Sequence, residues 1–191
     1  MSKRIALLSA AAFAALALTA TVAAPVHAEE KTVMVGGAAM FPSKNIIQNA
    51  VNSKDHTTLV AAVKAAGLVE TLEGKGPFTV FAPTNTAFGK LPAGTVDTLL
   101  KPENKGTLTT VLTYHVVPGR LTAANLMKAV KDGGGQAKFK TVAGGELTVT
   151  SPSAGKLTIT DAKGGASTVT IGDVLQSNGV IHVINSVLLP S

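Results

Sequence analysis

The segment that decides the fold lies close to the C-terminus and reads Ser177-Asn178-Gly179-Val180-Ile181-His182-Val183-Ile184-Asn185-Ser186-Val187-Leu188-Leu189-Pro190. From Val180 to Leu189 it is predominantly apolar on both faces of an extended chain, which predicts a strand at the centre of a sheet. Asn178-Gly179 directly before this run favours a tight turn. His182 shares a strand face with Val180 and Ile184, so we expect a satisfied core histidine rather than a ligand.

Upstream of this strand the chain alternates apolar and polar residues with period two, which is typical of half-buried antiparallel strands. The apolar positions of the series are Phe139, Leu147, Val149, Leu157, Ile159, Val169 and Ile171. Threonines occupy many of the positions between them and form the expected outer face. Gly144-Gly145 and Gly164-Gly165 supply the turns.

The first half of the chain predicts short helices around two short strands. Two helices are expected near the start, one capped by Ser43 and running through Val51, and one capped by Asp55 or Thr57 and ending at Gly67. A third follows a Thr84 cap, and three more are expected over 95–100, 105–112 and 122–131. The expected strands are Phe78 to Ala82 and Tyr114 to Val117. Residues 29–42 lack periodicity and predict a flexible leader. Because helices cluster first and strands later, the order indicates an α+β fold rather than alternating βαβ units.

The N-terminus has the organisation of an export signal. Lys3 and Arg4 precede an apolar run from Ile5 to Ala24, and Val26-His27-Ala28 offers a signal-peptidase site. An uncleaved anchor is the alternative, since the run is nearly long enough to span a bilayer. Cleavage after residue 28 would leave 163 residues (191 minus 28), enough for one domain with a core. The chain has no cysteine, so packing and hydrogen bonds must stabilise the exported protein, in a periplasm or outside the cell.

Three motifs together resemble a known family. The C-terminal segment follows Gly76-Pro77-Phe78-Thr79-Val80-Phe81-Ala82-Pro83-Thr84-Asn85-Thr86-Ala87-Phe88 and Leu112-Thr113-Tyr114-His115-Val116-Val117-Pro118-Gly119. Their order and spacing resemble the fasciclin domain, an extracellular module associated with adhesion and recognition. The resemblance covers residues 43 to 190 and implies an α+β fold with an antiparallel β core and short helices packed beside it. We therefore divide the chain into a signal peptide (1–28), a flexible N-terminal leader (29–42) and a fasciclin domain (43–191).

The resemblance also implies four contact residues. Fasciclin domains have a Tyr-His element, linked in animal members to integrin binding, and Tyr114 and His115 match it. Animal domains have an Asp-Ile pair credited with receptor contact, which Asp173 matches and Val174 approaches with one methylene fewer. The structural alternatives are a Tyr-His pair packed on opposite faces of a strand, an ordinary turn at Asp173, and core packing for Val174. Asn185 stands where the family commonly has aspartate, which keeps the hydrogen bonding and removes the charge.

Positive charge is concentrated in one part of the chain. The formal charge is +6, and removal of the two basic residues of the signal would leave +4. Residues 120–140 hold five basic residues against one acid, a sum of +4, so the rest of the mature chain is neutral. The lysines of this segment are Lys128, Lys131, Lys138 and Lys140. They predict a basic face that attracts anionic polysaccharide or lipid head groups, with a solubilising face as the alternative. The signal peptide and the lack of interleaved aromatic residues argue against nucleic acid.

The sequence contains no pattern for catalysis or metal binding. His56, His115 and His182 form no HExxH or HxH arrangement, and no Gly-x-Ser-x-Gly elbow is present. His56 follows Asp55 at a helix start, where we expect it to be solvated and without a role. We therefore predict no catalytic residue, no metal and no cofactor.

Taken together, the residues and the resemblance favour a secreted or periplasmic fasciclin-domain protein that mediates cell adhesion or surface recognition without catalysis. The expected partner is a cell-surface receptor or an anionic polysaccharide, with membrane head groups as a further candidate and no oligomeric state implied. Two alternatives stay open. A carrier of a small apolar ligand or lipid predicts a large apolar pocket. A hydrolase predicts carboxylates that converge in space.

Overall fold

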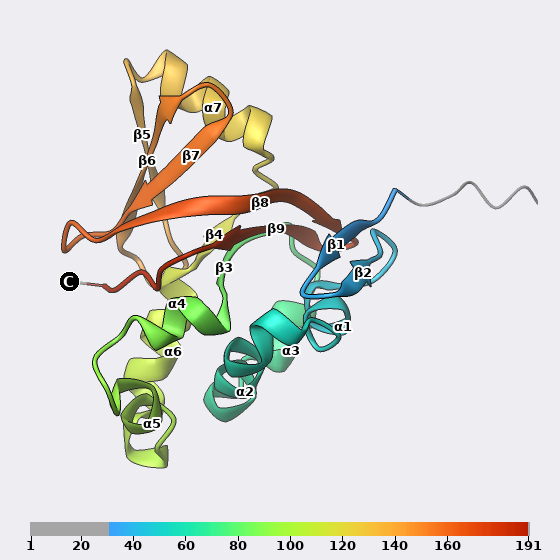
Figure 1. Ribbon diagram of the computed structural model, residues 1–191, viewed down its shortest axis with the longest axis vertical. Helices are drawn as coiled ribbons and strands as arrows, with labels where there is room; N and C mark the ends of the chain where they lie inside the picture. Colours follow the sequence, from blue (N-terminus) through green and yellow to red (C-terminus); the bar gives the residue numbers. More distant parts are fainter. Residues whose placement is uncertain (1–30, 191) are drawn as a thin grey trace, which may run out of the picture.

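The computed structural model describes residues 31–190, and the predicted signal peptide over residues 1–28 lies outside them. A seven-stranded sheet has the order β4-β3-β9-β8-β7-β6-β5, and a separate two-stranded sheet pairs β1 with β2. Helix α7 lies on one side of the large sheet, and α1 to α6 lie on the other (Figure 1). The predicted α+β class is therefore confirmed.

Strand β9 (Gly179–Ile184) lies in the middle of the sheet, and every one of its residues is buried. It pairs antiparallel with β8 (Ala166–Gln176) and parallel with β3 (Phe78–Pro83). The predicted central position is confirmed, although the strand ends at residue 184 rather than 189. The parallel pairing was not predicted, because no local pattern distinguishes the two directions of a buried strand. A short strand, β4 (Val116–Pro118), completes this side of the sheet by pairing antiparallel with β3.

The remaining strands form an antiparallel meander of β5 (Gln136–Lys140), β6 (Glu146–Ser153), β7 (Lys156–Thr160) and β8. Val149 lies opposite Ala137 on one side and Ile159 on the other, so inward-facing side chains align across three strands. Thr148 and Thr150 alternate with them and are half-buried. This alternation confirms the period-two prediction.

The helices are short, and one of the predicted N-caps, Thr84, is confirmed. Their bounds are α1 (Ile46–Ala50), α2 (Thr57–Ala66), α3 (Val69–Glu73), α4 (Asn85–Gly89), α5 (Thr95–Leu99), α6 (Lys105–Tyr114) and α7 (Ala123–Asp132), with 3-10 turns η1 (Lys54–His56) and η2 (Pro102–Asn104). Thr84 accepts a hydrogen bond from the Ala87 N–H and caps α4 as predicted. Asn45, rather than the predicted Ser43, caps α1 through the Gln48 N–H. Neither Asp55 nor Thr57 caps α2, because His56 holds the N-cap position and makes no side-chain cap hydrogen bond.

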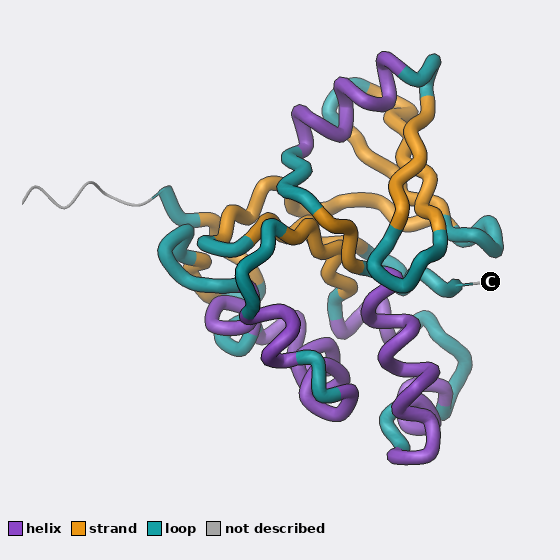
Figure 2. Tube along the Cα trace, turned by 180° about the vertical axis from the view of Figure 1, so that it is seen from behind, coloured by secondary structure: helices purple, strands orange, loops and turns teal. Residues whose placement is uncertain are grey.

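Two hydrophobic cores lie on the two faces of the large sheet, and β3 and β9 contribute to both. Val80 and Ile181 point into the first core, between the sheet and helices α1, α2, α3 and α6. Phe81 and Ile184 point into the second core, between the sheet and α7. Figure 2 shows the same division from behind, with α7 separated from the other helices by strands. Strands that serve two cores are apolar on both faces, which is the pattern present in the sequence.

The predicted flexible leader is wrong for most of its described part. Strands β1 (Val33–Val35) and β2 (Ala38–Met40) form an antiparallel hairpin. Val35 and Met40 at its two ends are buried in the first core. Val33 and Ala38 are partly buried against the same core. The two strands are only three residues long each, too short to produce a periodic pattern in the sequence. None of the helices within residues 31–190 has the length and apolar composition needed to span a membrane.

Candidate functional site

The Tyr-His element lies at the end of a helix and not on a strand as predicted. Tyr114 is the last residue of α6, and His115 follows it with αR backbone angles before β4 begins at Val116. The alternation rule that placed the two side chains on opposite faces of a strand therefore does not apply. Both side chains are buried, at 0% and 3% exposure. A direct contact between either side chain and a partner stays a prediction, and it would require surrounding elements to move.

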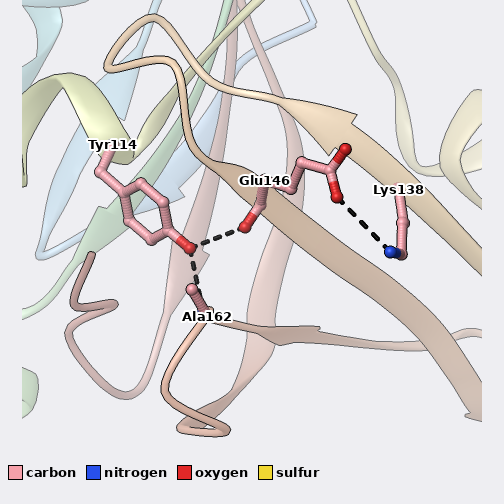
Figure 3. Close-up of polar contacts among 4 residues, drawn as sticks. All are labelled: Tyr114, Lys138, Glu146 and Ala162. Carbon is pink, nitrogen blue, oxygen red and sulfur yellow. Dashed lines mark hydrogen bonds and ion pairs between the residues drawn. The ribbon is translucent and has the colours of Figure 1, made fainter. Parts of the chain in front are cut away.

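The Tyr114 phenol joins two hairpins of the sheet. Its hydroxyl donates to the Glu146 carbonyl at 2.7 Å and accepts from the Ala162 N–H at 3.0 Å. Figure 3 shows Glu146 between two neighbours, with its carbonyl toward Tyr114 and its carboxylate toward Lys138. The tyrosine therefore fixes the positions of the β5–β6 and β7–β8 turns from the end of α6.

His115 uses both ring nitrogens inside the protein. The Leu188 backbone N–H donates to Nε2 at 3.0 Å, so Nε2 must be unprotonated. Nδ1 then carries the proton and donates to the Val111 carbonyl at 2.8 Å. Burial lowers the pKa of His115 to about 4, against smaller opposing contributions from the Val111 carbonyl and Asp161. At pH 7 the imidazole is therefore uncharged, and its two hydrogen bonds connect α6 to the C-terminal segment.

Asp173 occupies a bulge in β8. Gly172 and Asp173 lie together opposite the single residue His182 of β9, and Asp173 has a φ of 55°. The exposed carboxylate accepts from the Ala123 N–H at 2.7 Å, at the first residue of α7. A carboxylate at a helix N-terminus is favoured by the unpaired N–H groups there and by the helix dipole. The neighbouring Val174 is 1% exposed and belongs to the first core, as its structural alternative predicted.

His182 completes the connection between this bulge and α7. Its Nδ1 accepts from the Asp173 N–H at 3.4 Å, and its Nε2 donates to the Leu121 carbonyl at 2.8 Å. The ring also stacks on Phe81, with centroids 5.8 Å apart. Burial lowers the pKa of His182. Asp173 and His182 together hold the start of α7 against the sheet.

The four lysines of the predicted basic face are exposed but divide into two pairs. Lys128 and Lys131 lie on α7, while Lys138 and Lys140 lie on β5. On β5 the alternate residues Ala137 and Phe139 pack into the core beneath α7. The strand lysines therefore project from the sheet face opposite the helix, and the two pairs point to opposite sides of this layer.

Each pair contains one lysine with a carboxylate partner. Lys128 forms an i,i+4 ion pair with Asp132, and Lys138 lies 3.5 Å from the Glu146 carboxylate. Across residues 31–190 no carboxylate pairs with Lys131 or Lys140, so these two offer the more available charges. The fifth basic residue of this segment, Arg120, is occupied differently, because it donates to the backbone carbonyls of residues 176 and 177.

His56 is the residue that the sequence interpretation missed. It was expected to be solvated, but it is 3% exposed. Its Nδ1 lies 2.8 Å from the Ser53 hydroxyl, and its Nε2 has no hydrogen-bond partner. Burial lowers the pKa of His56 against opposing contributions from the Ala82 backbone and Asp55. A single histidine beside an aspartate carries no sequence signal for burial, which depends on packing by β3.

The carboxylates of the described chain do not form a metal centre. Within residues 31–190, no group of three or more His, Cys, Asp or Glu side chains is arranged to hold an ion. Asp161 is a buried carboxylate, and its oxygens accept from the N–H groups of Lys163, Gly165 and Leu189. These bonds hold a turn and the C-terminal segment in place. Asn185 similarly accepts from the Thr168 N–H at 2.9 Å.

Comparison with known proteins gives consistent matches. Residues 54–190 match the model of the Fasciclin domain. The chain is similar to Protein sll1483 of Synechocystis sp., with 45% identity over 177 residues that cover 92% of this chain and 90% of that protein. It is also similar to Cell surface glycolipoprotein MPB83 of Mycobacterium bovis, with 37% identity over 105 residues, 52% of this chain and 46% of that protein.

A solved structure has the same fold. The FAS1 domain pair from the insect cell adhesion molecule Fasciclin I matches with a TM-score of 0.69, over 78% of this chain and 52% of that one. The sequence identity in this match is 20%, so the match concerns the fold alone.

Proposed function

Because the chain belongs to the fasciclin domain family, we propose that it is an exported, non-catalytic protein that acts in adhesion or surface recognition. The observation that carries the proposal is the contrast between its buried and exposed polar groups. Tyr114, His115 and His182 are buried and bonded to the backbone, while the charged side chains of α7 and β5 face solvent. The name of the mycobacterial relative, a cell surface glycolipoprotein, supports a location at or outside the membrane.

An anionic polysaccharide is the partner that the charge distribution favours. Lys131 and Lys140 are exposed and have no carboxylate partner among the described residues, so they can pair with an external anion without breaking an internal ion pair. Exposed pairs of this kind are individually weak and are screened by salt. Recognition would therefore depend on several contacts along a polymer, and many copies on a surface would add avidity.

The test is binding of the purified protein to immobilised heparin and to uncharged dextran, at low and at physiological salt. Two double variants remove one basic pair each, and a third removes charge elsewhere on the meander. The variants are Lys128→Gln/Lys131→Gln, Lys138→Gln/Lys140→Gln and the control Lys156→Gln/Lys163→Gln. We expect weaker heparin binding in at least one of the first two, unchanged binding in the control, and a steep decrease with salt.

A protein receptor is distinguished by Asp173→Asn and intact cells. The amide retains an acceptor for the Ala123 N–H and tolerates a positive φ, so this hydrogen bond to α7 is kept while the charge is lost. Loss of cell binding in this variant alone would identify a receptor that contacts the Asp173 bulge. Equal heparin binding by all three lysine variants would refute the basic-pair proposal. An absence of binding to both heparin and cells would refute the adhesion proposal.

A further inference from the structure

The face of the β5–β8 meander that is turned away from α7 carries five threonines in adjacent positions. They are Thr148 and Thr150 on β6, Thr158 and Thr160 on β7, and Thr168 on β8. Thr148 lies directly opposite Thr160, while Thr158 lies opposite Thr150 on one side and Thr168 on the other. Side chains that lie directly opposite one another point to the same face of a sheet, roughly 5 Å apart from strand to strand. We call these five residues the threonine face.

Neither hydrophobic core covers the threonine face. The alternate residues of the same strands, among them Leu147, Val149 and Ile159, point the other way and pack in the second core beneath α7. Among the described residues, the first core contains none from β5, β6 or β7. These strands lie at the end of the molecule away from α1, α2 and α3 (Figure 1). The five threonines are half-buried, so neighbours in the sheet flank them while their outer surface meets solvent.

The hydroxyls of the threonine face are available to an external group. Within residues 31–190, none of the five makes a side-chain hydrogen bond. Other threonines of the protein are used internally, since Thr79 donates to the Gly119 carbonyl and Thr141 to the Gly145 carbonyl. A hydroxyl both donates and accepts, so it can bond to either role of another hydroxyl. Hydroxyls in adjacent positions across three strands therefore suit a ligand that carries many hydroxyls itself, as a sugar polymer does.

Positive charge adjoins the threonine face along β5. Lys138 lies directly opposite Thr148, and Lys140 projects from the same side of β5 two residues later. Lys138 lies 3.5 Å from the Glu146 carboxylate, whereas Lys140 has no carboxylate partner within residues 31–190. A row across three strands thus begins with a cation and continues with the hydroxyls of Thr148 and Thr160. This combination complements a polymer that carries both hydroxyls and carboxylate or sulfate groups.

We propose that the threonine face, together with Lys138 and Lys140, is the surface on which this protein binds an anionic polysaccharide. The lysines pair with its carboxylate or sulfate groups, and the threonine hydroxyls bond to its sugar hydroxyls. This inference rests on the proposed function, and it selects the β5 lysines over the α7 lysines as the pair that contacts the polymer. All the contacts are at the surface and individually weak, so binding depends on several sugar units held together.

The experiment is an NMR titration of the purified protein, labelled at its threonine methyl groups, with a heparin oligosaccharide. A neutral malto-oligosaccharide is the uncharged probe. Heparin should shift the methyl signals of the threonine face and leave those of Thr98 on α5 and Thr107 on α6 unchanged. The neutral sugar should produce smaller shifts at the same methyl groups, because it makes the hydroxyl contacts without the lysine contacts.

Matched double variants test the hydroxyls themselves. Thr148→Val/Thr160→Val keeps the shape and strand propensity of the side chains and removes two hydroxyls, so heparin affinity should fall roughly five-fold or more. The control Thr98→Val/Thr107→Val removes two exposed hydroxyls from helices α5 and α6 and should bind as the wild type does. Urea unfolding of each variant shows whether a change in affinity comes from a change in stability.

The outcomes separate this inference from the function on which it rests. Loss of heparin binding in Lys138→Gln/Lys140→Gln, with binding retained by the α7 double variant, supports the inference. Wild-type methyl shifts confined to the threonine face support it even if the valine variant does not fold. Heparin binding that leaves these methyl signals unshifted, or that is equally tight in Thr148→Val/Thr160→Val, overturns the threonine face and leaves polysaccharide recognition standing. An absence of heparin binding by the wild type overturns both.

Discussion

Acidification should destabilise the protein through its buried histidines, and His115 allows the size of the effect to be worked out. Its pKa is about 4 in the folded protein and 6.5 in the unfolded chain. Below pH 6.5 the His115 imidazole binds a proton in the unfolded chain but not in the folded protein. The free energy of unfolding therefore falls as the pH falls. The loss is complete near pH 4, where it reaches about 3 kcal/mol for this one residue.

The cause is visible in the hydrogen bonds of the ring. Protonation of Nε2 would place a proton against the Leu188 N–H, so the buried ring would gain a charge and lose an acceptor together. His56 and His182 are also buried, their pKa values are also lowered, and their contributions have the same sign. A total loss of this size is a large part of the stability of an ordinary domain.

The assay is urea unfolding followed by circular dichroism between pH 7 and pH 4, for the wild type and for His115→Gln. The variant should be less stable at pH 7 by about 1–3 kcal/mol, because glutamine cannot reproduce both ring hydrogen bonds. Between pH 7 and pH 4 it should lose about 3 kcal/mol less than the wild type does. Carboxylates titrate in the same range in both proteins and cancel in this comparison. An unchanged pH dependence in the variant, or an NMR pKa of His115 near 6.5, would refute the reasoning.

Further predictions concern the elements around this region, and urea unfolding tests each of them. Tyr114→Phe removes both hydrogen bonds of the phenol and should cost about 1–3 kcal/mol, whereas an unchanged midpoint would show that water replaces them. Gly145→Ala places a Cβ 2.7 Å from the Tyr114 ring and should cost about 1–3 kcal/mol. Gly106→Ala on α6 is its control, meets nothing within 4 Å, and should stabilise by up to about 1 kcal/mol. Asp173→Ala removes the acceptor of the first α7 N–H, places alanine at a φ of 55° and should cost about 1 kcal/mol or more, although the Thr122 cap remains; equal stability with the wild type would contradict that role.

At the candidate site, two predictions made from local sequence patterns were wrong. Tyr114 and His115 were assigned to a strand with the apolar neighbours Val116 and Val117, yet α6 extends through Tyr114. The helix continues because its side chains pack on α2 and the sheet, and tertiary packing outweighs weak local propensity. The lysines were predicted as one face from their closeness in sequence. They lie on two sides because helix and strand present their side chains with different periods and directions.

The sequence by itself determined the α+β class, the central strand, the period-two meander and the Thr84 cap, because each depends on residues within a few positions of one another. Only the tertiary structure decided the parallel pairing of β3 with β9, the packing of the 33–40 hairpin and the burial of His56. The same holds for the neutral state of His115, whose ring meets an N–H at residue 188. Such features depend on groups that the chain brings together across long separations, and the pattern of a short segment contains no information about them.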